Sequence, residues 1–201
     1  MDPRKERTIT ALLGAAEEIF RDRAAADVTV EEIAERAGVA PGSLYNHFGS
    51  KAGLRAAVVE RALRADRGHM DHAYRSGRPP IEQIYAAAEE YLAFYLAYPG
   101  YFRMLAFPPE PGQYAAGQEL ADRLAKSVDE QNQRLVAVLR QGIETGVLRE
   151  VDPEAAATVL WSAWNGVISL GWRPDALRRN EDELRALLAT ATDLVANGLL
   201  N

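Results

Sequence analysis

The fold is decided by residues 30–48, which read VEEIAERAGVAPGSLYNHF. Thr29 and Glu32 have the spacing of a capping box, in which each side chain binds the backbone N–H of the other residue, and this spacing predicts a helix start. Gly38 predicts the end of that helix, because glycine takes the left-handed conformation without a Cβ clash. Pro41 suits the first turn of a second short helix. The segment therefore predicts two short helices joined by a tight turn.

Helical periodicity extends outward from this segment in both directions. Apolar residues recur at three- and four-residue steps, which is the pattern of one buried helix face. Proline and glycine pairs interrupt the pattern and predict helix ends. The expected helices cover residues 8–20, 30–37, 41–47, a long stretch capped by Ser50, 81–98, 117–144, 153–170 and a stretch from residue 180, with a loop at 107–112. No strand-like alternation competes with these patterns.

The sequence thus predicts an all-α protein of about nine helices. Residues 1–50 form an N-terminal three-helix head that contains a helix-turn-helix. A long helix joins this head to a C-terminal helical body, residues 51–201.

Composition excludes several classes of protein. The 201 residues are 48% hydrophobic and 26% charged, which is typical of a globular chain. The absence of cysteine excludes disulfides, thiolate zinc sites and cysteine nucleophiles. No apolar run approaches the roughly 18 residues of a membrane span, and the N-terminal MDPRKERT has no apolar signal core. We therefore expect a soluble, cytosolic protein that does not bind membranes.

Charge is divided unevenly along the chain. Residues 1–80 hold 13 Lys and Arg against 12 Asp and Glu, whereas residues 81–201 hold 10 against 17. A nucleic-acid surface therefore belongs in the first part. Because that part is nearly neutral, phosphate binding would depend on a local group of basic side chains. The candidates for this group are Arg4, Lys5, Arg7 and Lys51; the alternative is that they form an ordinary solvated surface.

The second helix of a helix-turn-helix lies in the major groove of DNA. Leu44 and Phe48 are expected to face inward, which leaves the polar side chains of the same helix outward. Asparagine can pair with adenine through two hydrogen bonds, and Ser, Tyr and His reach phosphates or base edges. Gly42 would let the backbone approach the duplex closely. The alternative is a generic helical subdomain in which Tyr45 is partly buried.

These residues, from Val30 to Phe48 with Ser50-Lys51 after them, resemble the DNA-binding signature of the TetR family of bacterial regulators. The resemblance covers roughly residues 8–60. It implies that Tyr45 and Lys51 contact phosphates and that positions 43, 46 and 47 lie in or near the groove. The full predicted DNA-binding set is Thr29, Pro41, Gly42, Ser43, Tyr45, Asn46, His47 and Lys51.

The chain departs from the family pattern directly after Ser50-Lys51. The family usually has an acidic residue there, whereas this chain has Ala52 and Gly53. Glycine costs about 1 kcal/mol of helix propensity relative to alanine. We interpret this as a softer hinge between head and body, with neutral drift as the alternative.

Aromatic residues gather in the body and predict an effector site. Tyr91, Phe94, Tyr95 and Tyr98 share one helix face. Each buried tyrosine needs a partner for its hydroxyl, so this face suits a cavity for a mid-sized, largely apolar or aromatic molecule. The alternative is packed core. The predicted ligand-binding residues are Tyr91, Phe94, Tyr95, Phe102, Gln131, Trp161, Trp164 and Asn165.

The last two helices carry apolar faces that predict a homodimer. These faces hold Trp161, Trp164, Val167 and Ile168 on one helix and Leu187, Leu188, Ala191 and Val195 on the other. They could form a two-fold four-helix interface, and the resemblance implies dimerisation through these helices. The alternative is that both faces complete the core of one chain.

The function predicted from this reasoning is a ligand-responsive regulator, most simply a repressor. It would bind pseudo-palindromic double-stranded operator DNA as a homodimer and be released by a small, largely apolar effector. We expect no enzymatic activity, cofactor or metal. Two alternatives remain: a helical enzyme with a metal at His69 and His72, near Asp66, and a protein-binding adaptor that does not bind DNA.

Overall fold

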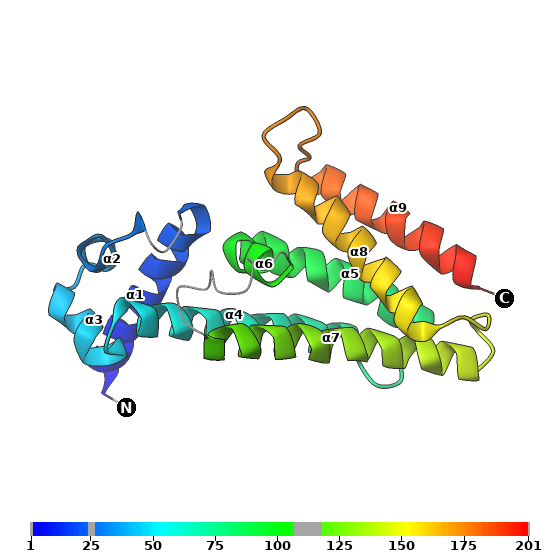
Figure 1. Ribbon diagram of the computed structural model, residues 1–201, viewed down its shortest axis with the longest axis horizontal. Helices are drawn as coiled ribbons and strands as arrows, with labels where there is room; N and C mark the ends of the chain where they lie inside the picture. Colours follow the sequence, from blue (N-terminus) through cyan, green and yellow to red (C-terminus); the bar gives the residue numbers. More distant parts are fainter. Residues whose placement is uncertain (1, 24–26, 107–117, 201) are drawn as a thin grey trace. The chain divides into compact units, whose positions relative to one another are not determined.

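A computed structural model describes residues 2–23, 27–106 and 118–200, and within these ranges the protein is built from helices (Figure 1). The α-helices are α1 Pro3–Asp22, α2 Val30–Ala37, α3 Pro41–Phe48, α4 Lys51–Ala73, α5 Pro80–Ala97, α6 Pro99–Ala106, α7 Gln118–Glu144, α8 Pro153–Ser169 and α9 Glu181–Leu199, with a short 3-10 turn at Leu170–Trp172. The described ranges contain no strand, so the all-α prediction is confirmed. No helix among them is long and apolar enough to cross a bilayer.

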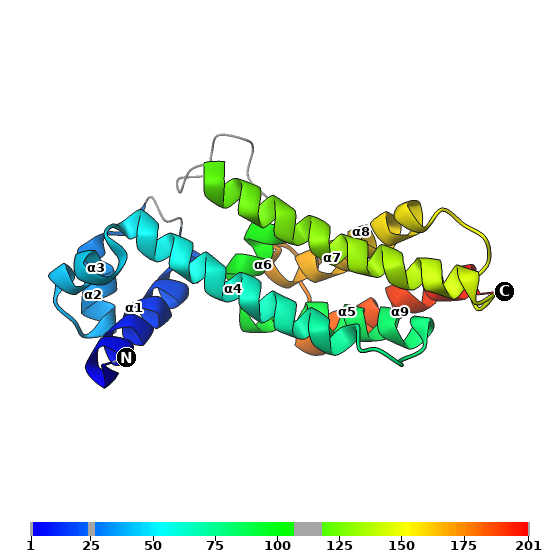
Figure 2. The same ribbon diagram turned by 90° about the horizontal axis from the view of Figure 1, so that it is seen from below.

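The helices form two compact units. The first contains Met1–Arg64 and Tyr98–Ala125, and the second contains Ala65–Ala97 and Lys126–Asn201. Helices α4 and α7 each contribute residues to both units, and α4 runs without a break between them (Figure 2).

Helices α1, α2 and α3 pack against one another in the first unit. Leu12, Ile33 and Leu44, one from each helix, are fully buried. Burying such a side chain contributes about 1.5–3 kcal/mol. Because α2 and α3 have only eight residues each, and helices this short are marginal alone, this packing is what holds them in place.

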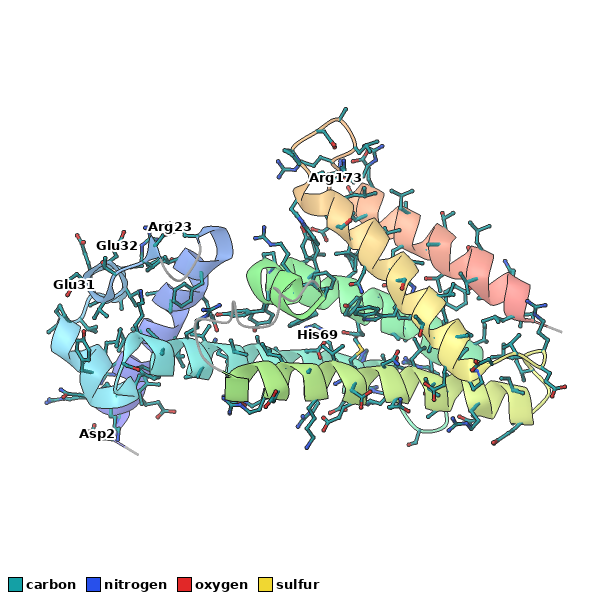
Figure 3. The ribbon with its side chains drawn as sticks, viewed as in Figure 1. Asp2, Arg23, Glu31, Glu32, His69 and Arg173 are labelled. Atoms are coloured by element: carbon teal, nitrogen blue, oxygen red, sulfur yellow. The ribbon has the colours of Figure 1, made fainter. Side chains whose placement is uncertain are left out.

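The capping box of α2 is formed as expected. The Glu32 backbone N–H donates to Thr29 Oγ1 at 3.1 Å, and the Thr29 N–H donates to Glu32 Oε2 at 2.7 Å. Arg23 also pairs with the Glu32 carboxylate at 2.8 Å (Figure 3). The hydrogen bond from Arg23, helped by the one from Thr29, lowers the pKa of Glu32 to about 2. Gly38 ends the helix with a φ of 66°, which confirms its predicted left-handed conformation.

The start of α4 corrects the interpretation of Gly53 as a softer hinge. Ser50 caps the helix as predicted, since its Oγ accepts from the Gly53 N–H at 3.0 Å. A Cβ at position 53 would lie 2.0 Å from the Phe48 carbonyl oxygen. Glycine is therefore required here by a close approach of the backbone, and its low helix propensity is the cost of that approach.

One predicted boundary is wrong and one helix was not predicted. Helix α1 begins at Pro3, where Asp2 Oδ1 accepts a hydrogen bond from the Arg4 N–H, and not at Thr8. Helix α5 ends just before the Pro99-Gly100 pair, as expected, but Pro99 also begins α6, because the missing N–H of proline costs nothing in a first turn. The predicted loop at 107–112 lies outside the described residues.

Helices α5, α8 and α9 pack together in the second unit. Leu92, Leu160 and Leu188, one from each helix, are almost completely buried. The Trp164 indole N–H donates to Thr192 Oγ1 at 3.0 Å, and this hydrogen bond between α8 and α9 is itself buried. The core of this unit therefore combines apolar packing with a few satisfied polar groups.

Removal of the α2 cap tests how far the head depends on it. Thr29→Ala should lower the free energy of unfolding by about 1 kcal/mol, because the Glu32 N–H loses its acceptor. Urea unfolding followed by circular dichroism measures the change. Thr29→Ser should retain stability. Thr190→Ala is the matched control, since the Thr190 hydroxyl only bonds the preceding helical turn; an equal loss in both alanine variants would contradict the role of the cap.

Candidate nucleic-acid interface and ligand site

Helix α3 presents a polar edge to solvent. Leu44 is fully buried, whereas the next residue, Tyr45, is 53% exposed. Asn46 is also exposed, as are Pro41 and Gly42 at the start of the helix. A Cβ at Gly42 would have no atom within 4 Å, so the backbone there is open to a close partner. This part of the predicted DNA-binding set therefore lies on one accessible edge.

The remaining predicted DNA-binding residues are partly engaged within the protein. Ser43 and His47 are half-buried. Thr29 is exposed, but its hydroxyl is held in the capping box. The Lys51 ammonium donates to the Val28 carbonyl oxygen at 2.6 Å. Because an ammonium carries three N–H donors, Lys51 keeps two for another acceptor while this bond fixes its position.

The basic residues near α1 differ in their partners. Arg4, Lys5 and Arg7 are exposed, and among the described acidic side chains none forms an ion pair with them. By contrast, Arg36 pairs with Glu18 at 3.1 Å and Arg23 with Glu32. The N-terminus therefore holds exposed basic side chains without an acidic partner in the described part of the chain, although Asp2 and Glu6 lie among them in the sequence.

In the second unit, the structure brings four of the predicted ligand-binding residues together. The Tyr91 hydroxyl donates to Asn165 Oδ1 at 2.9 Å, and the Tyr91 and Trp164 rings lie with centroids 6.4 Å apart. Burial raises the pKa of Tyr91 and the nearby charge of Asp66 adds to this, against hydrogen bonds with Trp161 and Asn165. Helices α5 and α8 thus build one buried polar and aromatic cluster.

Asn165 has an unsatisfied donor in this cluster. The side chain is 5% exposed, and its Nδ2 finds no hydrogen-bond partner within the described part of the chain. A buried polar group without a partner costs about 1–3 kcal/mol. Proteins retain such a group mainly where a ligand, an ion or a water satisfies it.

Sequence reasoning missed Asp66 as a buried acid and considered it only beside a metal. The structure buries it to 5% exposure on α4. Burial raises the pKa of its carboxyl to about 6, against the opposing charges of His69, Arg134 and Arg67. The sequence did contain a signal for this burial. Asp66 lies four residues from both Ala62 and Met70, which are buried, and an acid within such an apolar helix stripe is rarely solvated.

The other predicted ligand-binding residues are dispersed. Phe94 is fully buried, with its ring 6.3 Å from that of His69. Gln131 is half-buried and accepts a hydrogen bond from Arg134. Phe102 belongs to the first unit and not to the second.

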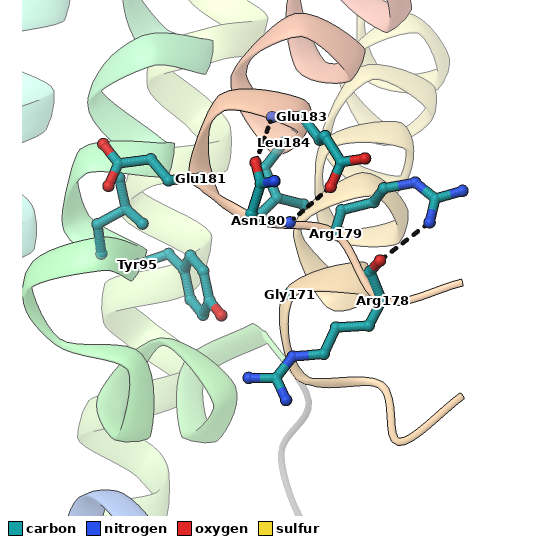
Figure 4. Close-up of a pocket in the computed structure, with 9 residues that line it drawn as sticks. Tyr95, Gly171, Arg178, Arg179, Asn180, Glu181, Glu183 and Leu184 are labelled. Carbon is teal, nitrogen blue, oxygen red and sulfur yellow. Dashed lines mark hydrogen bonds between the residues drawn. The ribbon is translucent and has the colours of Figure 1, made fainter. Parts of the chain in front are cut away.

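Tyr95 lines a separate groove, of about 480 Å³ (Figure 4). Its ring lies 5.5 Å from that of Trp172, and a Cβ at Gly171 would come within 2.4 Å of its hydroxyl oxygen. Arg178 and Glu183 both line the groove, so its charge is mixed and favours no single class of ligand.

His69 and His72 both contact one carboxylate. His69 Nδ1 lies 2.6 Å from Glu90 Oε2, and His72 Nδ1 contacts Glu90 Oε1. Burial would raise the pKa of Glu90, but the hydrogen bonds with both imidazoles outweigh it and lower the pKa. Within the part of the chain that the structure describes, no three His, Asp or Glu side chains are arranged to hold a metal ion.

Helices α8 and α9 leave apolar side chains exposed: Leu187 is one of the predicted interface residues, whereas Val159 and Leu194 were not predicted. Trp164, Ile168 and Leu188 are buried in the chain itself, which agrees with the alternative of core packing for these positions. Val159 and Leu194 are 55% and 73% exposed. They line an apolar groove of about 380 Å³ together with Ala155, Ala156, Val195, Gly198 and Leu199, near Arg149, Val151 and Asp152.

The Tyr91–Asn165 hydrogen bond can be tested against a matched tyrosine on the same helix. Tyr91→Phe should lower the free energy of unfolding by about 1–3 kcal/mol, because it leaves Asn165 Oδ1 buried without a donor. Tyr85→Phe removes an exposed bond to Asp193 that water can replace, and should cost less than about 1 kcal/mol. Urea unfolding measures both; equal costs would contradict the burial argument.

Comparison with known proteins identifies both parts of the chain. Residues 12–58 match the family "Bacterial regulatory proteins, tetR family", and residues 84–195 match "Tetracyclin repressor-like, C-terminal domain". The transcriptional repressor KstR2 of Mycobacterium tuberculosis is 30% identical over 142 residues, which cover 69% of this chain and 68% of KstR2. The transcriptional activator FasR of Mycolicibacterium smegmatis is 38% identical over 92 residues, which cover 46% of this chain and 42% of FasR.

Solved structures share the fold over nearly the whole chain. PfmR from Thermus thermophilus superposes with a TM-score of 0.70 at 25% identity, covering 94% of this chain and 99% of PfmR. A complex of SmeT with triclosan reaches a TM-score of 0.75 at 21% identity, covering 96% and 92%. The ketosteroid regulator KstR2 reaches 0.74 at 20% identity, covering 100% and 97%. The chain belongs to the TetR family of bacterial transcriptional regulators.

Proposed function

We propose that this protein is a ligand-responsive repressor that acts in the cytoplasm as a homodimer. It binds pseudo-palindromic operator DNA and leaves it when a small, largely apolar effector binds. The observation that carries the proposal is the orientation of α3, in which Leu44 is buried and Tyr45 and Asn46 are exposed on the opposite edge. Such an edge matches the recognition helix of a helix-turn-helix.

The residues of the head divide between positioning and sequence reading. Tyr45 and Lys51 contact phosphates, which orient the protein without selecting a sequence. Ser43, Asn46 and His47 read base edges, while Pro41, Gly42 and Thr29 border the same surface. We assign DNA binding to residues 1–50, and effector binding and dimerisation to residues 51–201.

The nature of the effector follows from the second unit and from two relatives. Tyr91, Trp161 and Trp164 surround a small polar centre at Asn165, which suits a mainly apolar molecule with few polar groups. Two related structures are those of a ketosteroid regulator and of SmeT in complex with triclosan. Ketosteroids and triclosan are mainly apolar ring compounds with few polar atoms, and this supports the same class of effector for this chain.

The homodimer forms through α8 and α9. Val159 and Leu194 are exposed although they are apolar, and they border one groove. A two-fold axis would bring two copies of this groove together as a four-helix interface. Two α3 helices would then reach successive half-sites of the operator.

Helix α4 offers the connection between effector and DNA. Lys51 lies at its start and Asp66 lies fifteen residues later, about 22 Å along the helix axis. A displacement of the helix at one end is therefore carried to the other. The effector favours release only as far as it binds the released conformation more tightly.

Sequence reading by Asn46 is tested by comparing it with Tyr45. Asn46→Ala should change the preferred operator bases, at about 1–3 kcal/mol for a lost bidentate contact. Tyr45→Phe and Lys51→Gln should weaken binding to all sequences alike, and Lys51→Gln should reduce the salt dependence by about one counterion. Selection from randomised duplexes and fluorescence anisotropy measure these effects, with Tyr85→Phe as the control. An unchanged preference in Asn46→Ala would contradict direct reading there.

The dimer interface is tested at its most exposed leucine. Leu194→Glu should raise the dimer dissociation constant by at least about tenfold, because each subunit would bury a charge without a partner. Sedimentation equilibrium measures this constant. Leu177→Glu is the matched control, since Leu177 is also 51% exposed but lies between α8 and α9. A dimer that survives Leu194→Glu would place the interface elsewhere.

A further inference from the structure

We propose that Asp66 and Asn165 form the polar end of the effector site, and that this end selects an uncharged hydroxyl group on an otherwise apolar molecule and rejects a carboxylate. The inference rests on the proposed function, because it assumes that the second unit holds an effector. All the residues that carry it belong to that unit: Asp66 on α4, Tyr91 on α5 and Asn165 on α8.

Asn165 requires a hydrogen-bond acceptor. Its Oδ1 is already occupied by the Tyr91 hydroxyl at 2.9 Å, which also fixes the orientation of the amide. Its Nδ2 is buried and has no acceptor among the described residues. An oxygen atom of a bound molecule would complete this amide.

Asp66 requires a hydrogen-bond donor or a positive charge. It is 5% exposed, and none of the described residues donates a hydrogen bond to its carboxylate. The positive groups near it, His69, Arg67 and Arg134, act on it only through their charge. All three have other partners: His69 contacts Glu90, Arg134 pairs with Asp71 at 2.8 Å, and Arg67 pairs with Glu130 at 3.4 Å.

Tyr91 links the two groups in space. Its hydroxyl donates to Asn165, and the charge of Asp66 acts on the same hydroxyl and raises its pKa. His69, three residues after Asp66 on α4, contacts Glu90, the residue before Tyr91 on α5. This contact brings the part of α4 that carries Asp66 against the part of α5 whose Tyr91 bonds Asn165. The Trp164 ring, 6.4 Å from that of Tyr91, supplies an apolar boundary.

A hydroxyl group is the simplest partner for both sites, because its oxygen accepts one hydrogen bond while its proton is donated to another group. A ketone would satisfy Asn165 but not Asp66. A carboxylate would also satisfy Asn165, but its charge would lie near that of Asp66, and like charges repel strongly where water is excluded.

The selectivity should depend on pH. The carboxyl of Asp66 has a pKa raised to about 6 by burial, so Asp66 is ionised above this pH and becomes neutral below it. The other groups around it are Arg67 and His69 on α4, Arg134 on α7, and the hydroxyls of Tyr74 and Tyr91. Rejection of a carboxylate should therefore be strongest above about pH 6 and weaken as the pH falls below it.

The test uses matched probes on the full-length protein: naphthol against naphthoate, and decanol against decanoate. Quenching of the fluorescence of Trp161 and Trp164 measures binding. Near neutral pH the wild type should bind each alcohol at least about tenfold more tightly than its acid. Asp66→Asn keeps the shape but removes the charge, and should bring the ratio close to one. Asp71→Asn is the matched control on α4, where Asp71 is exposed, and should leave the ratio unchanged.

Operator binding, measured without any probe, separates this inference from the proposed function. A wild type that binds no operator DNA overturns the proposed function, whatever the probes do. A wild type that binds operator DNA but shows no preference for the alcohols, or binds neither pair, overturns the assignment of Asp66 and Asn165, and a buried water then satisfies Asn165. An Asp66→Asn variant that binds operator DNA normally but keeps the full preference for the alcohols also overturns this assignment.

Discussion

Burial of a large aliphatic side chain on each short helix, Ile33 on α2 and Leu44 on α3, is the constraint on which the head depends. Helices α2 and α3 have eight residues each, too few for a stable isolated helix, so Ile33 and Leu44 must be covered by α1. That requirement fixes the rotation of α3 about its axis. Tyr45 and Asn46 then face solvent because Leu44 cannot. The candidate DNA-reading edge is therefore a consequence of core packing.

The second unit shows the opposite arrangement, in which polar groups are retained inside the core. Trp164 and Thr192 satisfy each other, as ordinary buried polar groups do. Asp66 and the amide nitrogen of Asn165 have no such partners among the described residues. Buried polar groups normally have hydrogen-bond partners, and exceptions to this rule are expected mainly at functional sites. In the function that we propose, the head thus binds DNA through exposed side chains, and the body binds its effector through buried polar groups that lack partners.

Local signals in the sequence were sufficient for the head but not for the body. Thr29, Glu32 and Gly38 lie within nine residues of one another, and their spacing alone predicted the cap and the turn. The burial of Asp66 had only a weak local signal, its spacing from the buried Ala62 and Met70 on the same helix, because its burial also depends on segments far along the chain. The helix that begins at Pro99 was missed because proline suits a helix start as well as an interruption. The aromatic face of α5 was predicted, but spacing could not show that its tyrosines have different neighbours: Tyr91 bonds Asn165, whereas Tyr95 lines a separate groove.

Gly53 has a consequence for protein engineering. Replacing helical glycines by alanine is a routine route to thermostable variants, since alanine restricts the unfolded chain. At this position the added methyl would overlap the Phe48 carbonyl oxygen and force the recognition helix to shift. Consensus or propensity-based redesign would rank the site among the best to change, whereas the backbone makes it one of the worst. Biosensors built on this scaffold should keep that codon fixed and place their diversity elsewhere.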